Sequence, residues 1–193
     1  QGAPDHTSAA VLGRRTRRMP SLLDPLPEYN RASLGHGMSI ERASIDLASA
    51  CGEEVELQRA ALPDARIELR VQGDTTGQFD GSRVREALTN LVLNAIKYGL
   101  PSEPVVVRLE GQDQEVRVSV ENAAAEDIPA AKMQQLFEPL RRGDGQRPGS
   151  DRTHLGLGLF IARQIARAHG GDVHGHSSSQ RVRFTIILPK SVP

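Results

Sequence analysis

The sequence predicts an α/β fold on two observations of spacing, and its composition indicates what fills the core. From residue 38 onward, stretches in which apolar and polar residues alternate are followed by stretches with helical spacing. Residues 83–98 form the strongest helical segment, with Val84, Leu88, Leu91 and Ala95 along one stripe. Aromatic residues are scarce, with four Phe, two Tyr and no Trp, so the core must be built from aliphatic side chains.

The expected elements follow from the spacing of apolar residues. Strands are expected where apolar and polar residues alternate, at 38–45, 66–71, 77–80, 105–110, 115–121, 172–176 and 181–188. Helices are expected where apolar residues recur every three or four positions, at 46–62, 83–98, 130–136 and 156–169. Pro63 ends the first helix, Ser82 is the expected N-cap of the second, and Gly99 follows its last turn.

The first 37 residues differ from the rest. Residues 1–8 show no period, and residues 9–30 have helical spacing that Pro20, Pro25 and Pro27 interrupt; a proline inside a helix costs about 3 kcal/mol. We therefore expect two parts: a proline-interrupted arm at 1–37 and a folded domain at 38–193.

The charge balance and the single cysteine narrow the classes of function. The chain has 24 basic and 24 acidic residues, which excludes a broadly basic nucleic-acid binder. Cys51 has no partner for an internal disulfide, which fits a reducing, cytoplasmic location. There is no signal peptide and no apolar run of roughly 20 residues, so no membrane segment is expected in this chain.

The helix at 83–98 carries three polar residues on one face. Asn90, Asn94 and Lys97 are spaced i, i+4 and i+7. An amide oxygen is a suitable ligand for Mg²⁺, and a lysine neutralises phosphate charge, so the pattern suits a triphosphate bound with a divalent cation. The alternative is a solvated polar helix face.

A second polar segment stands at a loop-to-helix junction. Gly156 and Gly158 lie in the run His-Leu-Gly-Leu-Gly-Leu, where glycines let a backbone approach a phosphate at a helix N-terminus. The alternative is that these glycines simply begin a helix. The spacing does not fit the dinucleotide-binding fingerprint.

Together these segments resemble the ATP-binding domain of a sensor histidine kinase, in the superfamily shared with DNA gyrase, the Hsp90 chaperones and MutL. Four stretches carry the resemblance in order, namely 85–98 (the N box), 136–143 (the F box), 156–171 (the second glycine box and its helix) and 184–189 (the last strand). The resemblance implies a two-layer α/β sandwich, with a mixed, mostly antiparallel sheet and three helices on one face.

The resemblance also implies roles for individual residues. Asn94 would coordinate Mg²⁺, and Asn90 and Lys97 would contact the phosphates of ATP, while residues 138–154 would form a lid. The full set of ATP-binding residues implied is Asn90, Asn94, Lys97, Tyr98, Asn122, Ile128, Phe137, Arg141, Arg142, Gly156, Leu157, Gly158, Leu159 and Thr185.

The first glycine box departs from the family pattern. Residues 120–129 contain no glycine, and Asn122 stands where the family has its adenine-reading aspartate. Asn can still accept from the adenine amino group, although charge-assisted hydrogen bonds are stronger. The altered box favours an alternative reading, a pseudokinase-like regulatory module with weak nucleotide binding that acts through protein contacts.

None of the six histidines has the sequence context of a phosphoacceptor, so no catalytic residue is expected in this chain. The implied partners are the dimerisation and phosphoacceptor hairpin of the same protein, with residues 1–37 as a remnant of its second helix, and a response regulator. A hydrolytic ATPase of the chaperone or mismatch-repair type is disfavoured, because Asn90 occupies the place of its glutamate base. His174 and His176 suggest a metal pair, but no third ligand can be placed.

Overall fold

The computed structural model describes residues 38–139 and 157–191. The expected arm at 1–37, most of the expected lid, and the site residues Arg141, Arg142 and Gly156 lie outside the described residues.

The main sheet has five strands in the order β2-β4-β5-β7-β6. One pair, β2 with β4, is parallel, and the other three pairs are antiparallel. The strands are β2 (Ile67–Gln72), β4 (Val105–Gly111), β5 (Glu115–Ala123), β7 (Arg181–Pro189) and β6 (Asp172–Ser178). This arrangement confirms the mixed, mostly antiparallel sheet.

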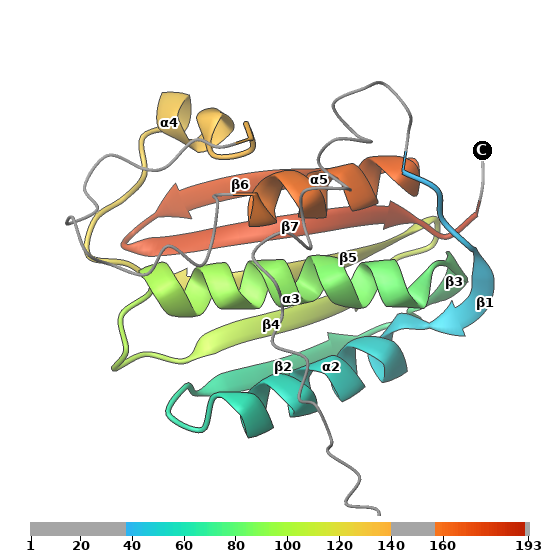
Figure 1. The fold of residues 1–193 in the computed structure, drawn as a ribbon, viewed down its shortest axis with the longest axis horizontal. Helices are drawn as coiled ribbons and strands as arrows, with labels where there is room; N and C mark the ends of the chain where they lie inside the picture. The colour runs from blue at the N-terminus through green and yellow to red at the C-terminus, as the bar shows by residue number, and fades with distance from the viewer. Residues whose placement is uncertain (1–37, 140–156, 192–193) are drawn as a thin grey trace, which may run out of the picture.

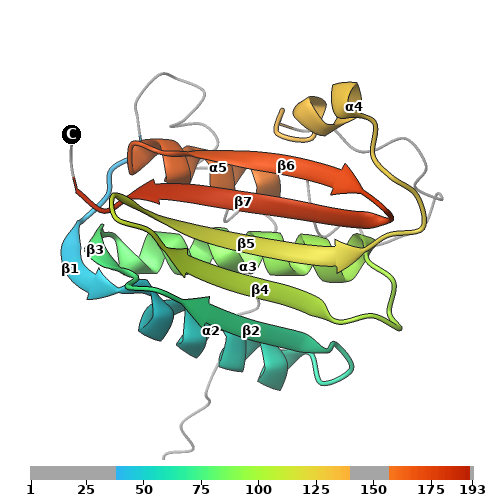
Figure 2. The ribbon, with the colours of Figure 1, turned by 180° about the vertical axis from the view of Figure 1, so that it is seen from behind.

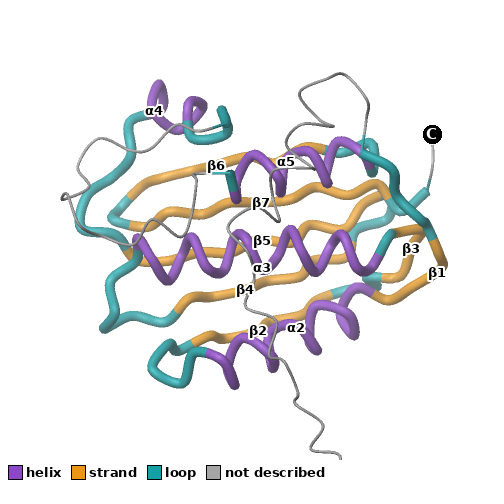
Figure 3. Tube along the Cα trace, in the orientation of Figure 1, coloured by secondary structure: helices purple, strands orange, loops and turns teal. Residues whose placement is uncertain are grey.

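Two of the expected short strands form a second sheet, a pairing that the sequence did not indicate. β1 (Ala43–Asp46) pairs antiparallel with β3 (Thr76–Phe79). Figure 3 shows this pair at one end of the molecule, beyond the ends of the main strands. The strand expected at 38–45 is therefore shorter and begins later, because only its last residues find a partner.

Three helices cover one face of the main sheet (Figure 1). They are α2 (Leu47–Ala61), α3 (Gly81–Tyr98) and α5 (Gly158–Ala168), and α4 (Ala130–Gln135) lies near β6. The opposite face carries no described helix (Figure 2). The two-layer sandwich is confirmed.

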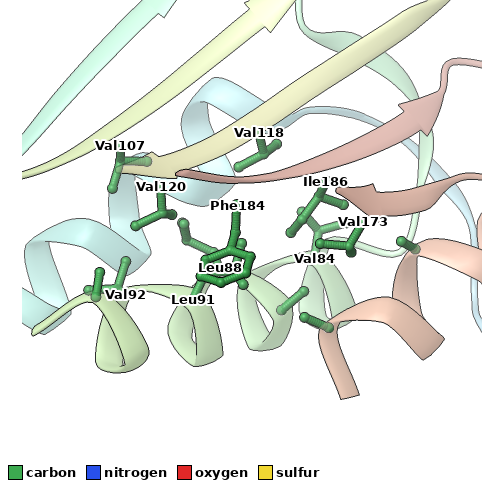
Figure 4. Packing of buried hydrophobic residues seen from close by; sticks show 14 of the residues in the cluster. Val84, Leu88, Leu91, Val92, Val107, Val118, Val120, Val173, Phe184 and Ile186 are labelled. Carbon is green, nitrogen blue, oxygen red and sulfur yellow. The ribbon is translucent and has the colours of Figure 1, made fainter. Parts of the chain in front are cut away.

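The core lies between α3 and the sheet (Figure 4). Leu88 and Leu91 of α3 are fully buried, and they face the alternate residues of β5 and β7 that point to this side, such as Val120 and Phe184. Burying a Leu or Phe side chain stabilises a fold by about 1.5–3 kcal/mol. This packing fixes the rotation of α3, and so it fixes which of its side chains face away from the sheet.

The first turn of α3 corrects one prediction. The N-cap is Asp80, not Ser82, and its Oδ1 accepts from the backbone N–H of Arg83 at 3.1 Å. Ser82 lies inside the helix and is exposed. Asp80 is the N-cap because its backbone is extended, as this position requires, whereas Ser82 already has helical backbone geometry.

Candidate functional site

The polar face of α3 carries the three side chains that the sequence singled out. Asn90 and Asn94 are half-buried, and Lys97 in the last turn is exposed. The Nδ2 of Asn90 donates to the carbonyl of Glu86 at 3.0 Å, so its Oδ1 is directed elsewhere. Among the described residues, the carboxamide of Asn94 has no hydrogen-bond partner. An amide oxygen without a partner is suited to bind a cation or to accept a hydrogen bond from a ligand.

The first turn of α5 lies against Asn90. A β-carbon placed on Gly158 would lie 3.1 Å from the Oδ1 of Asn90, a closer approach than most side chains tolerate. The structure thus brings the two sequence segments together, through a residue that has no side chain. The N-cap residue, Leu157, provides no side-chain cap, so the N–H groups of this turn point outward with a partial positive charge.

Asn122 lies at the end of β5, on the face of the sheet that α3 covers. It is buried, and its Nδ2 donates to the carbonyl of Ala123 at 2.9 Å. The backbone at Gly99, just after α3, approaches it closely: a β-carbon there would lie 3.2 Å from the Cβ of Asn122. Asn122 therefore borders the same end of α3 as Lys97 and Tyr98.

Tyr98 is the exposed aromatic residue at this end, with 53% of its surface accessible. The Nζ of Lys97 lies 5.3 Å from the centre of its ring. An exposed ring beside a cation offers a flat apolar surface at the edge of the site.

Four other expected contact residues belong to the core or its edge. Phe137 is buried edge-on against Phe184, with ring centres 5.8 Å apart. Leu157 and Leu159 are also buried, and Ile128 is partly buried. Their side chains belong to the packing around α5 and the sheet.

Thr185 is not brought to this group. It lies opposite Ser119 in β7, whereas its neighbours Phe184 and Ile186 point to the helices. Side chains alternate along a strand, so Thr185 lies on the face of the sheet without helices. The alternation Val182, Phe184, Ile186 could have shown this from the sequence.

His169 and Asp80, at the end of α5 away from Asn90, form a pair that the sequence did not reveal. His169 follows α5 and is fully buried, and its Nε2 accepts from the backbone N–H of Asp80 at 3.0 Å. Burial lowers the pKa of His169 below the ordinary imidazole value. A histidine closing the apolar stripe of a helix was the only signal in the sequence, and it does not reveal a partner 89 residues away.

The described residues contain no group of three His, Cys, Asp or Glu side chains placed to hold a metal. His174 and His176 are both exposed on β6, and no third ligand lies beside them within the part of the chain described. Within the same ranges, no helix is long and apolar enough to cross a membrane.

Residues 79–192 match the family described as histidine kinase-, DNA gyrase B-, and HSP90-like ATPase. The chain belongs to this ATPase family. The match includes α3, β5 and α5, so the elements that form the candidate site lie inside the family domain.

Curated relatives of this ATPase domain are sensor proteins. The chain is 31% identical over 174 residues to the bacteriophytochrome of Pseudomonas aeruginosa, covering 89% of this chain and 23% of that protein. It is 34% identical over 151 residues to the sensor histidine kinase CusS of Escherichia coli O157:H7, covering 78% of this chain and 31% of CusS. The chain thus spans about a quarter to a third of these relatives.

Solved structures of histidine kinases share the fold. The nucleotide-free catalytic domain of ThkA is 25% identical, with a TM-score of 0.66, and covers 80% of this chain and 100% of its own. Full-length ShkA in complex with AMPPNP has a TM-score of 0.73 at 24% identity, covering 89% of this chain and 36% of ShkA. ThkA in complex with the response regulator TrrA has a TM-score of 0.66 at 24% identity, covering 87% of this chain and 48% of ThkA.

Proposed function

We propose that this chain is the ATP-binding catalytic domain of a sensor histidine kinase, with the nucleotide between α3 and α5. The observation that carries the proposal is the contact of Gly158 with Asn90. It places a helix N-terminus without a side-chain cap beside the polar face of α3. Backbone N–H groups, two carboxamides and a lysine then converge where a triphosphate would lie.

The side chains divide the ligand between them. Asn90 and Lys97 contact the phosphates of ATP, and the ring of Tyr98 lies over the nucleotide. Asn122 uses its Nδ2 on Ala123, so its Oδ1 is the atom that accepts from the adenine amino group. Arg141, Arg142 and Gly156, outside the described residues, would add phosphate donors.

A Mg²⁺ ion fits the donor set of this site. The Asn94 carboxamide is half-buried and without a hydrogen-bond partner in the described residues, and an amide oxygen is a ligand that Mg²⁺ accepts. When bound with ATP, the ion would neutralise phosphate charge.

The reaction is phosphoryl transfer to a histidine outside this chain. An imidazole nitrogen of that histidine forms the new P–N bond, the bond from the γ-phosphorus to the bridging oxygen breaks, and ADP leaves with the electron pair. The residues of this chain bind and orient the triphosphate, which is most of what such catalysis requires. The acceptor is a histidine on the dimerisation hairpin of the same protein, and a response regulator receives the phosphoryl group next.

Calorimetric titration with AMPPNP, with and without Mg²⁺, tests the proposal. We expect binding that strengthens with Mg²⁺, and an Asn94→Ala variant that loses about tenfold or more in affinity for the Mg²⁺ complex, because one contact to a charged ligand contributes about 1.5–3 kcal/mol.

Arg85→Ala is the matched control on α3. Its guanidinium lies 3.3 Å from Glu53 of α2, on the side of the helix away from the site, so nucleotide affinity is expected to stay unchanged. A wild-type chain that binds no nucleotide at millimolar concentration would refute the proposal and leave the pseudokinase-like reading.

A further inference from the structure

Asp80 joins three segments that are distant in sequence. Its Oδ1 caps α3 through the N–H of Arg83, and its Oδ2 accepts from the N–H of Glu41 at 2.9 Å. Its own backbone N–H donates to the Nε2 of His169 at 3.0 Å. One residue thus ties the start of α3 to the end of α5 and to the chain that enters β1.

The hydrogen bonds of His169 define its protonation state. A backbone N–H can only donate, so Nε2 must accept from it and carries no proton. The proton of the neutral ring is therefore on Nδ1. Nδ1 lies 2.8 Å from the carbonyl of Ile165, one turn earlier in α5, and donates to it. The buried ring is therefore a neutral imidazole with both nitrogens used.

A second bond holds the same end of α5. The Nη2 of Arg42 donates to the carbonyl of Ala168 at 3.2 Å, and Arg42 lies directly before β1. The last turn of α5 is thus held from two sides, by Asp80 and by Arg42.

The two ends of α5 contact different parts of α3. The start, at Gly158, meets Asn90 in the middle of α3, and the end, at His169, meets the N-cap Asp80. The helices are therefore antiparallel, with the junction at the β1–β3 end of the molecule (Figure 1). Eleven residues of helix span about 16 Å.

This geometry links a shift at one end of α5 to a shift at the other. The helix has a fixed rise of about 1.5 Å per residue, so a displacement of about 1 Å along its axis at His169 moves Gly158 by about the same distance. The buried side chains of α5, such as Ile161 and Ile165, hold it against the core, and the directed hydrogen bond at His169 sets where its end lies along α3.

We propose that His169 is a positioning residue: its hydrogen bond to Asp80 fixes the position of α5 along α3, and so aligns the first turn of α5 with Asn90 for phosphate binding. This inference rests on the nucleotide site proposed above. His169 itself lies at the opposite end of α5 and does not touch the ligand.

Two substitutions separate the hydrogen bond to Asp80 from the rest of the side chain. His169→Gln keeps an acceptor near the place of Nε2 and so keeps the bond to Asp80. His169→Asn keeps a donor near the place of Nδ1 and so keeps the bond to Ile165, but it does not reach Asp80. Both remove the imidazole ring, which packs 6.4 Å from the ring of Phe79, so the loss of packing is shared.

The experiment is AMPPNP titration with Mg²⁺ on the full chain, with thermal unfolding measured on the same samples. We expect H169N to raise the Kd about tenfold, since misplacement by about 1 Å is costly in such sites, while H169Q stays near wild type. Both variants lower Tm to a similar extent. Asp46→Ala, which removes the side-chain cap of α2, lowers Tm without raising the Kd, because α2 carries no site residue.

Equal Kd values for H169N and H169Q would overturn the positioning role, whether both shift or neither does. A wild-type chain without nucleotide binding would instead refute the proposed function. If H169N does not fold, His169→Leu takes its place, since leucine fills the buried position but offers no acceptor to the Asp80 N–H. A His169→Leu Kd equal to that of H169Q then overturns the inference, and a Kd several-fold higher supports it.

Discussion

Asn94 and Asn122 carry the same carboxamide, but their surroundings use it differently. Asn122 is buried and spends its NH₂ group on the carbonyl of Ala123, which leaves the oxygen for a ligand. Asn94 is half-buried, and neither end of its amide is paired within the described residues. Asn122 is thus held in one orientation, whereas Asn94 can turn to meet what binds.

Cys51 illustrates how burial controls reactivity at a single residue. Burial, with a smaller effect of the Glu54 carboxylate, raises the pKa of its thiol to about 12. Because the thiolate is the reactive form, we expect the folded protein to react with a disulfide reagent at pH 8 roughly 10³-fold more slowly than an unperturbed thiol.

The measurement is the rate of thiol release with the reagent, in native buffer and in urea. The unfolded chain serves as the control, since it exposes the same thiol. Equal rates in the two conditions would contradict the buried, protonated state.

His169 makes stability depend on pH in a defined direction. Burial lowers its pKa in the folded state, and the Arg42 guanidinium acts in the same direction, although the Ile165 carbonyl and Asp80 oppose them. The unfolded chain therefore binds the proton more readily, so the contribution of His169 is complete above about pH 6.5 and is lost as the pH falls below it.

Urea unfolding at pH 7.5 and pH 5.5 tests this linkage. We expect the free energy of unfolding to fall more for wild type than for His169→Gln, which does not titrate. The exposed His174 and His176 are present in both proteins and cancel in the comparison. A larger loss in the variant would show that another group dominates.

At the scale of elements, the end of α5 depends on a glycine. Gly170 has φ of +84°, and it forms a Schellman motif in which Gly170 and Gly171 donate to the carbonyls of Arg167 and Ala166. We expect Gly170→Ala to destabilise the fold by about 1–2 kcal/mol, because an L side chain is strained there.

Gly52→Ala is the matched control inside α2. A β-carbon there would meet the Leu69 side chain at an ordinary 3.8 Å. Alanine in a helix interior is favoured over glycine by about 0.5–1 kcal/mol, so this variant is expected to stabilise the fold. Urea unfolding of both variants checks the opposite signs. A destabilised Gly52→Ala would show that α2 has less room than the structure indicates.

Helices and strands whose bounds follow from local apolar spacing could be predicted from the sequence. Bounds that depend on pairing with a distant segment could not. The helix at 83–98 and the strand at 181–188 stand within two residues of their expected bounds, because apolar spacing fixes them. The start of β1 depends on pairing with β3, and the choice of Asp80 over Ser82 as N-cap depends on the backbone path before α3.

The candidate site divides in the same way. Asn90, Asn94 and Lys97 share a helix face whatever surrounds it, so their grouping could be read from spacing alone. The junction of Asp80 with His169 spans 89 residues, and no local pattern encodes it. Thr185 was misplaced because its role came from a resemblance, while the alternation of its own strand contradicted that role.

For the whole molecule, we expect nucleotide binding without phosphoryl transfer to the chain itself. No histidine of this chain has an acceptor context, so incubation with γ-labelled ATP is expected to leave the chain without acid-labile phosphate. Addition of a phosphoacceptor hairpin from a histidine kinase provides the control that the transfer chemistry works. Acid-labile label on this chain alone would show that one of its own histidines accepts the phosphoryl group.

The position of β7 has a consequence for synthesis. β7 is the last strand in sequence, yet it lies between β5 and β6 and pairs with both. A nascent chain that has been translated only to residue 180 therefore holds two strands with no common neighbour. The sheet can close only after residue 189 has left the ribosome, and until then the backbone edges of β5 and β6 that pair with β7 have no partner strand, which is the state in which strand edges are prone to associate with other chains.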